Sequence, residues 1–170
     1  MFSNIGYSGQ IALKKAKVCI VGLGGLGCHA APQLAAMGVG FLRIVDQDVV
    51  DLSNLHRQML YTMDDIGYPK VEAAEKRLHQ LNPQLEVEPL PMVICGYTAE
   101  NLVKDVDVVV DGLDSVETRY DVNRACVKYR VPFIHAGAIE TLGSASTIIP
   151  YKTPCLQCIY PSLRDEDMAK

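Results

Sequence analysis

The chain has 170 residues, of which 49% are hydrophobic and 21% charged, and this suffices for one domain with a buried core. Its formal net charge of −4 provides no basic surface, so neither nucleic acid nor an anionic membrane is a favoured partner. No apolar run approaches the roughly 18 residues of a membrane-spanning helix, and the first residues lack the build of a signal peptide. We therefore expect a cytoplasmic protein whose cysteines are reduced thiols.

The first part of the chain predicts a β-α-β unit followed by a further helix. Residues 17–21 and 41–45 are short β-branched runs separated by the length of a helix. Apolar residues then recur at helical spacing from 71 to 81, where the pair Asn82-Pro83 ends the pattern.

The second part continues this alternation. We expect a weaker strand at 85–90, a strand at 106–110, a helix with Val116, Tyr120, Asn123 and Val127 on one face, and strands at 133–136 and 145–150. Continuous apolar strands are typical of a parallel sheet that is buried on both faces and has right-handed crossovers. The predicted fold class is therefore α/β, with a Rossmann-like, doubly wound, mostly parallel sheet and helices on both faces. The polar tail at 164–170 is expected to fray.

A glycine-rich turn lies between the first predicted strand and its helix. Its candidate phosphate-binding residues are Gly22, Gly24, Gly25 and Gly27. Glycines at this position let the backbone approach a phosphate, and the free N–H groups of the following helix face the anion. Asp46 ends the second strand about 20 residues on, where a carboxylate accepts hydrogen bonds from ribose hydroxyls. The arrangement predicts a bound nucleotide, and to this point NAD and ATP fit equally well.

Two cations and a carboxylate favour ATP over NAD. Arg57 offers a planar fork and Lys70 a compact charge, and together they suit a triphosphate. Asp114 follows the strand at 106–110 and is the candidate ligand for Mg²⁺, which prefers one or two carboxylates plus phosphate oxygens and waters. Ordinary structural roles remain open at this stage: Arg57 and Lys70 can be surface cations, and Asp111 or Asp114 can cap the next helix.

The chain resembles the ThiF/MoeB/HesA group of E1-like, ubiquitin-activating-type adenylyltransferases. The resemblance rests on residues 22–27, 46–58, 67–74, 81–83 and 111–114. It implies ATP-dependent adenylation, with release of pyrophosphate, of the C-terminal glycine carboxylate of a ubiquitin-like sulfur-carrier protein, for sulfur transfer in thiamin or molybdopterin-type cofactor biosynthesis. Carried over by position, Gly25 and its neighbours bind phosphate, Asp46 the ribose, Asn54, Arg57 and Lys70 the triphosphate, and Asp114 the Mg²⁺. The same nucleotide site includes Asp48, Ser53 and Gln58.

The chemistry of these residues agrees with that activity. A carboxylate is already ionised near pH 7, so its attack on the α-phosphorus of ATP needs no general base. The enzyme must place the nucleophile in line and neutralise charge as pyrophosphate leaves. Arg57, Lys70 and Asp114 with its metal are therefore the candidate catalytic residues.

Cys155 and Cys158 have the spacing of half a zinc site. The other cysteines precede them, and the pattern buries Cys19 and Cys126. The resemblance implies a second C-x-x-C near the end of a longer chain, so we expect C-terminal truncation, with residues 155–170 beginning a zinc-knuckle region that the pattern leaves open to disorder. Zn²⁺ with ligands from another chain, a disulfide and an empty pair all remain open. No cysteine follows Cys158, so we assign no nucleophilic cysteine.

Alternative functions remain open beside carrier adenylation. An E1-like enzyme can act on a small-molecule, peptide or tRNA-linked carboxylate, and a nucleotide-binding partner subunit without turnover is the non-enzymatic alternative. The resemblance implies a homodimer, in which an N-terminal arm with arginines reaches the neighbour's ATP site. No arginine precedes Tyr7, so we do not expect that arm here. An NAD-dependent oxidoreductase is less favoured, because it would leave Arg57, Lys70 and Asp114 unexplained together.

Overall fold

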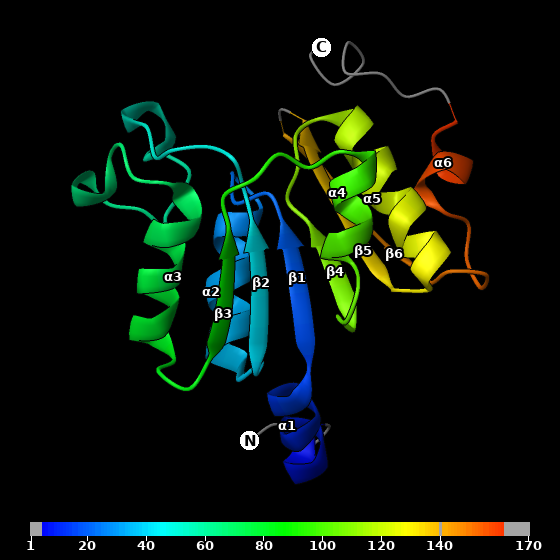
Figure 1. Cartoon of the computed structure of the whole chain (residues 1–170), viewed down its shortest axis with the longest axis horizontal. Coiled ribbons are helices and arrows are strands. Elements are labelled where there is room, and N and C mark those ends of the chain that lie inside the picture. The colour runs from blue at the N-terminus through cyan, green and yellow to red at the C-terminus, as the bar shows by residue number, and fades with distance from the viewer. Residues whose placement is uncertain (1–4, 140, 162–170) are drawn as a thin grey trace.

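A six-stranded sheet organises the computed structural model, which describes residues 5–139 and 141–161 (Figure 1). The strand order is β3-β2-β1-β4-β5-β6. The strands are β1 (Lys17–Val21), β2 (Phe41–Val45), β3 (Glu86–Leu90), β4 (Val108–Asp111), β5 (Phe133–Ile139) and β6 (Leu142–Ile148). Neighbouring strands run parallel except β6, which is antiparallel to β5. The α-helices are α1 (Gly6–Lys15), α2 (Gly27–Met37), α3 (Lys70–Leu81), α4 (Gly96–Leu102), α5 (Val116–Tyr129) and α6 (Leu156–Ile159), and two short 3₁₀ helices, η1 (Leu52–Asn54) and η2 (Met63–Asp65), follow β2.

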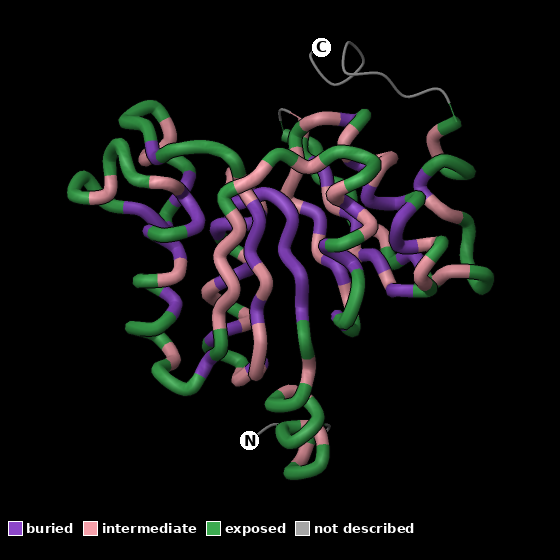
Figure 2. Tube along the Cα trace, viewed as in Figure 1, coloured by how far each residue is buried: buried purple, intermediate pink, exposed green. Residues whose placement is uncertain are grey.

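Alternate side chains of β1 supply two separate cores. Val18 and Ile20 belong to a cluster with residues of α2 and α3, whereas Cys19 and Val21 belong to a cluster with residues of α4 and α5. In Figure 2 the central strands are buried along most of their length. The mostly parallel, doubly wound sheet with helices on both faces is therefore confirmed, and burial on both faces explains the continuous apolar runs.

The structure confirms the predicted bounds of β1 and β2 and moves several others. The strand expected at 106–110 begins at Val108 and includes Asp111. The strand expected at 133–136 extends to Ile139, and the one expected at 145–150 begins at Leu142. These two strands pair from Phe133↔Ile148 to Ile139↔Leu142, and this pairing includes small polar residues that an apolar pattern does not reveal. The tail at 164–170 lies outside the described residues.

The face predicted for α5 is only half right. Val116 and Asn123 are buried as expected, whereas Tyr120 and Val127 are only half-buried. Arg119 is buried in their place, at 3% exposure, with an ion-pair partner on β4. A rule that assigns charged residues to the solvent misses such a position, because burial of a charge becomes acceptable only with a partner.

The parallel strands β1 to β5 direct their carboxyl ends to one end of the sheet, and α1 lies at the opposite end (Figure 1). The turn before α2, the segment between β2 and α3, and the loop between β4 and α5 all follow strand carboxyl ends. Open parallel sheets bind ligands at this end. Among the described residues, no helix has the length and apolar character needed to cross a membrane.

Candidate nucleotide-binding site

A pocket of about 920 Å³ opens at the carboxyl ends of the central strands. It brings together most of the predicted site residues, which are Gly22, Gly24, Gly25, Asp46, Asp48, Asn54, Arg57, Gln58, Lys70 and Asp114. Gly27 and Ser53 do not line it. Residues from three separate loops therefore meet around one cavity that is large enough for a nucleotide.

The glycine-rich turn packs backbone against backbone. Gly22 has a φ of +86°, and a Cβ added to it would lie 2.6 Å from the Gly112 carbonyl oxygen. A Cβ on Gly27 would lie 1.9 Å from the Gly22 carbonyl oxygen, whereas a Cβ on Gly25 would meet no atom within 4 Å. Gly22 and Gly27 thus permit close packing, and Gly25 leaves the pocket open to a ligand.

Asp46 fixes the two loops beside it. Its Oδ2 accepts a hydrogen bond from Leu23 N at 2.7 Å, and its Oδ1 accepts one from Asp48 N at 2.8 Å. Burial raises the pKa of Asp46 above its usual value, although these two N–H groups act in the opposite direction. Each carboxylate oxygen has a second lone pair, so ribose binding by Asp46 remains compatible with this geometry and stays a prediction.

Lys70 is buried at the first position of α3 and is not a solvated surface cation. Its Nζ lies 2.7 Å from Asp48 Oδ2, and its backbone N donates to Asp48 O at 2.9 Å. The side chain of Lys70 is 5% exposed, whereas that of Asp48 is 56% exposed. An ammonium group has three N–H donors, so Lys70 can donate to a phosphate in the pocket while it contacts Asp48.

Arg57 extends from the segment after η1 and is exposed. Asp51 caps η1 by accepting from Ser53 N at 2.8 Å, and Arg57 Nη1 donates to Ser53 O at 3.0 Å. No ion pair recorded within the described ranges involves Arg57. Its guanidinium charge therefore remains available to an anion in the pocket.

Gln58 has an unsatisfied polar atom beside the glycine-rich turn. The residue is 2% exposed, and its Oε1 is buried without a hydrogen-bond partner in the described part of the chain. Its Nε2 lies 4.0 Å from the position of a Cβ on Gly24. An unsatisfied buried amide oxygen is costly, so a ligand or water that donates to it is favoured here.

Asp114 is exposed at the pocket and does not cap α5. The cap is Ser115, whose Oγ accepts from Thr118 N at 3.3 Å. Asp111 does not cap it either, because its side chain is buried against Arg119 and His135. Both capping alternatives are therefore wrong. A single exposed carboxylate that lines the pocket fits Mg²⁺, which takes one or two carboxylates and completes its shell with waters and phosphate oxygens.

The sequence patterns did not predict several of the residues that line the pocket. Met92, Val93 and Ile94 form part of its wall, and Arg119 reaches it from α5. The segment 92–94 follows the carboxyl end of β3, so the rule that ligands bind at these ends could have found it. Arg119 carried no sequence signal apart from its charge.

Cys155 and Cys158 lie side by side at the start of α6. Their sulfurs are 3.6 Å apart and both thiols are free. Two Zn–S bonds at a tetrahedral angle would place sulfurs roughly 3.8 Å apart, so the pair fits two zinc ligands. The described residues contain no group of three or more potential metal ligands, and the other half of such a site is not among them.

In protein freed of metal with a chelator, alkylation of the native fold is expected to label Cys155 and to spare Cys19. Burial alone raises the pKa of Cys155, but hydrogen bonds, led by those from Cys158, lower it overall. At a given pH, Cys155 is therefore more often a thiolate than an ordinary cysteine is, and near pH 7 it reacts faster with iodoacetamide. Burial raises the pKa of Cys19 to about 12. Peptide mass spectrometry after timed labelling measures both, and equal labelling of the two cysteines in the native protein would contradict this prediction.

The fold and the pocket define a nucleotide-binding α/β domain: a glycine-rich turn follows the first strand of the sheet, a carboxylate ends the second, and cations stand beside them. The model of the ThiF family matches residues 1–170, and the chain belongs to this family.

Similar proteins agree with this membership. The chain is 41% identical over 165 residues to the sulfur carrier protein ThiS adenylyltransferase of Bacillus subtilis, covering 96% of this chain and 49% of that protein. It is 40% identical over 161 residues to the SAMP-activating enzyme E1 of Haloferax volcanii, covering 95% of this chain and 59% of that protein. The structure of E. coli MccB with ATP matches with a TM-score of 0.82 and 34% identity, covering 88% of this chain and 46% of that one. The chain thus spans about half the length of these relatives.

Proposed function

We propose that this chain is the ATP-binding domain of an E1-like adenylyltransferase that activates the C-terminal carboxylate of a ubiquitin-like sulfur-carrier protein. The observation that carries the proposal is the meeting of Arg57, Lys70 and Asp114 around a glycine-lined pocket. The names of two relatives, an adenylyltransferase of the sulfur carrier ThiS and a SAMP-activating enzyme, support this choice of substrate. The similarity to the structure of MccB with ATP supports the choice of nucleotide.

Each side chain has a distinct task in this proposal. Gly24 and Gly25 leave room for phosphates beside the first turn of α2, and Asp46 accepts hydrogen bonds from the ribose. Lys70 and Arg57 bind phosphate oxygens and neutralise charge as pyrophosphate leaves. Mg²⁺, when bound, would add positive charge at the phosphates. The carboxylate nucleophile is already ionised, so no residue has to remove a proton.

Four further properties are part of the proposal. Cys155 and Cys158 would supply two ligands to Zn²⁺, at the start of a zinc-binding region. The protein would form a homodimer, and it would work in the cytoplasm, in the biosynthesis of thiamin or a molybdopterin-type cofactor. The names of the ThiS and SAMP relatives favour a sulfur carrier over a small-molecule, peptide or tRNA-linked carboxylate.

ATP–pyrophosphate exchange tests the proposal directly. Purified protein is incubated with ATP, Mg²⁺ and labelled pyrophosphate, with and without the ThiS protein of Bacillus subtilis. We expect exchange that depends on ThiS and that is lost when ThiS lacks its C-terminal glycine. Exchange stimulated by small carboxylates but not by ThiS would favour the alternative enzyme. Tight ATP binding without exchange in any of these mixtures would favour a subunit without turnover.

A further inference from the structure

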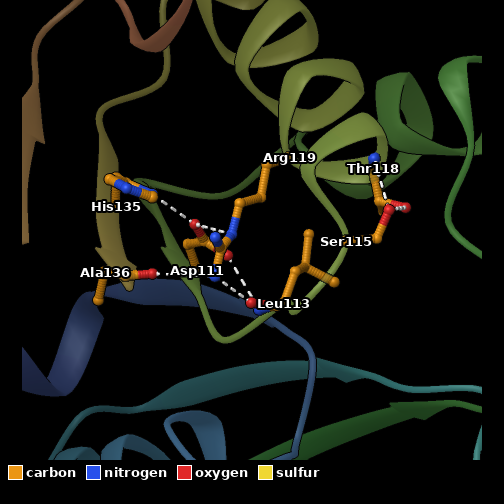
Figure 3. A network of polar contacts seen from close by, with 7 residues as sticks. All are labelled: Asp111, Leu113, Ser115, Thr118, Arg119, His135 and Ala136. Atoms are coloured by element: carbon orange, nitrogen blue, oxygen red, sulfur yellow. Dashed lines mark hydrogen bonds and ion pairs between the residues drawn. The ribbon is translucent and has the colours of Figure 1, made fainter. Parts of the chain in front are cut away.

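A buried polar network contacts Leu113, in the loop between β4 and α5 (Figure 3). Asp111, the last residue of β4, has no exposed side-chain surface. Its Oδ2 lies 3.2 Å from Arg119 Nε and 2.7 Å from His135 Nδ1. Because a carboxylate oxygen accepts, His135 donates from Nδ1. A buried carboxylate with an arginine and a histidine on one oxygen is well compensated, and none of the three groups takes part in the chemistry proposed above.

Besides pairing buried charges with one another, the network makes hydrogen bonds to the backbone of the loop between β4 and α5. Asp111 Oδ1 accepts from Leu113 N at 2.9 Å, and Arg119 Nη2 donates to the Leu113 carbonyl oxygen. The same Nη2 lies 3.3 Å from the Ala136 carbonyl oxygen on β5. Both backbone polar groups of Leu113 are therefore fixed by the Asp111–Arg119 pair, and this anchor ties the loop to the neighbouring strand.

Asp114 is the next residue, and it is exposed at the pocket. Its own side chain has no hydrogen bond recorded among the described residues, so its position depends on the backbone on either side. On one side Leu113 is held by Arg119, and on the other side Ser115 caps α5. The loop also touches the glycine-rich turn, because a Cβ on Gly112 would lie 2.4 Å from Gly22 O.

We propose that Arg119 is a positioning residue of the nucleotide site: by holding the Leu113 carbonyl and the Asp111 carboxylate together, it sets the place from which Asp114 meets the metal and the phosphates. This inference rests on the proposed function, since it assigns a role at the same pocket. Arg119 suits this task because the planar guanidinium reaches a carboxylate and a carbonyl in fixed directions, which a lysine ammonium cannot reproduce.

The test measures metal-dependent ATP affinity rather than turnover. Isothermal titration calorimetry gives the dissociation constant of ATP with Mg²⁺ and again with EDTA, and their ratio reports how well the site uses the metal. We expect Arg119→Lys to reduce this ratio about tenfold while affinity in EDTA changes little, because small misplacements of a site residue have effects up to about 10²-fold. His135→Asn is the matched control, since His135 contacts Asp111 but not Leu113. It should leave the ratio unchanged.

A double variant separates positioning from stability. Asp111→Asn combined with Arg119→Met removes both buried charges together, which often restores much of the stability lost when one member of a pair is removed. Nothing in this variant donates to the Leu113 carbonyl in place of Arg119. We expect a folded protein, by thermal unfolding, in which the Mg²⁺-dependent ratio remains about tenfold reduced.

The outcomes are distinguishable. Recovery of the wild-type ratio in the stable double variant would show that Arg119 only supports the fold, and an unchanged ratio in Arg119→Lys would also overturn the inference. In both cases wild-type protein still binds ATP with Mg²⁺, so the proposed function stands. Absence of ATP binding by the wild-type protein would instead overturn the proposed function itself.

Discussion

Replacing Lys70 by alanine is expected to lower the rate of carrier-dependent ATP–pyrophosphate exchange roughly 10- to 150-fold, because one charge-assisted contact to phosphate is worth about 1.5 to 3 kcal/mol. The fold should survive. Asp48, the partner that loses its cation, is 56% exposed and remains solvated, so the ion pair itself adds little to stability. Exchange measured at saturating carrier, together with thermal unfolding, separates the two effects.

Lys76→Ala is the matched control for this variant. Lys76 also lies on α3 but is exposed and does not line the pocket. The substitution removes the same charge from the same helix, so the two variants differ mainly in position. Equal exchange rates in Lys70→Ala and Lys76→Ala would remove Lys70 from the site.

Replacing Gly27 by alanine is expected to destabilise the domain by about 2 kcal/mol. The added Cβ would lie 1.9 Å from the Gly22 carbonyl oxygen, a backbone atom that cannot rotate away. Such overpacking costs about 1–3 kcal/mol or more, and the gain in helix propensity of up to about 1 kcal/mol offsets part of it. For a domain of this size the melting temperature should fall by roughly 4 to 8 °C.

Gly25→Ala provides the contrast within the same turn. A Cβ on Gly25 meets no atom within 4 Å, so its free energy of unfolding should change by no more than about 0.5 kcal/mol. Its methyl group would enter the pocket, and ATP affinity should fall instead. Equal thermal stability of the two variants would show that the contact between Gly22 and Gly27 is not as tight as described.

The fold was predictable where burial on two faces produced a strong pattern. β1 and β2 are mostly apolar, with Lys17 and Arg43 as the exceptions, and their bounds follow from the sequence. β6 was placed three residues too late, because Leu142 to Ser144 joins the sheet through backbone hydrogen bonds with β5 while remaining exposed. An edge strand of small polar residues is defined by its partner, and a single segment of sequence does not contain that partner.

The site was predictable where the residue type had few other uses. A glycine-rich turn between a strand and a helix, with Asp46 after the next strand, indicates a nucleotide site at a defined edge of the sheet. Arg119 could not be found in this way. Its role depends on its distance to Asp111 and Leu113, which lie eight and six positions earlier and meet it only after α5 packs on the sheet.

Some groups around the pocket are ordered when the chain folds, whereas others lose conformational entropy only when a ligand binds. Gly22 and Gly112 contact each other through backbone atoms alone, so this part of the pocket lining is already ordered before a ligand binds. Lys70 is likewise immobilised by Asp48 when the chain folds. Arg57 and Asp114 are exposed, and fixing such side chains on binding costs about 0.5–1.5 kcal/mol each. Differences in nucleotide affinity between this chain and its relatives should therefore originate mainly in how well these two side chains are ordered in advance.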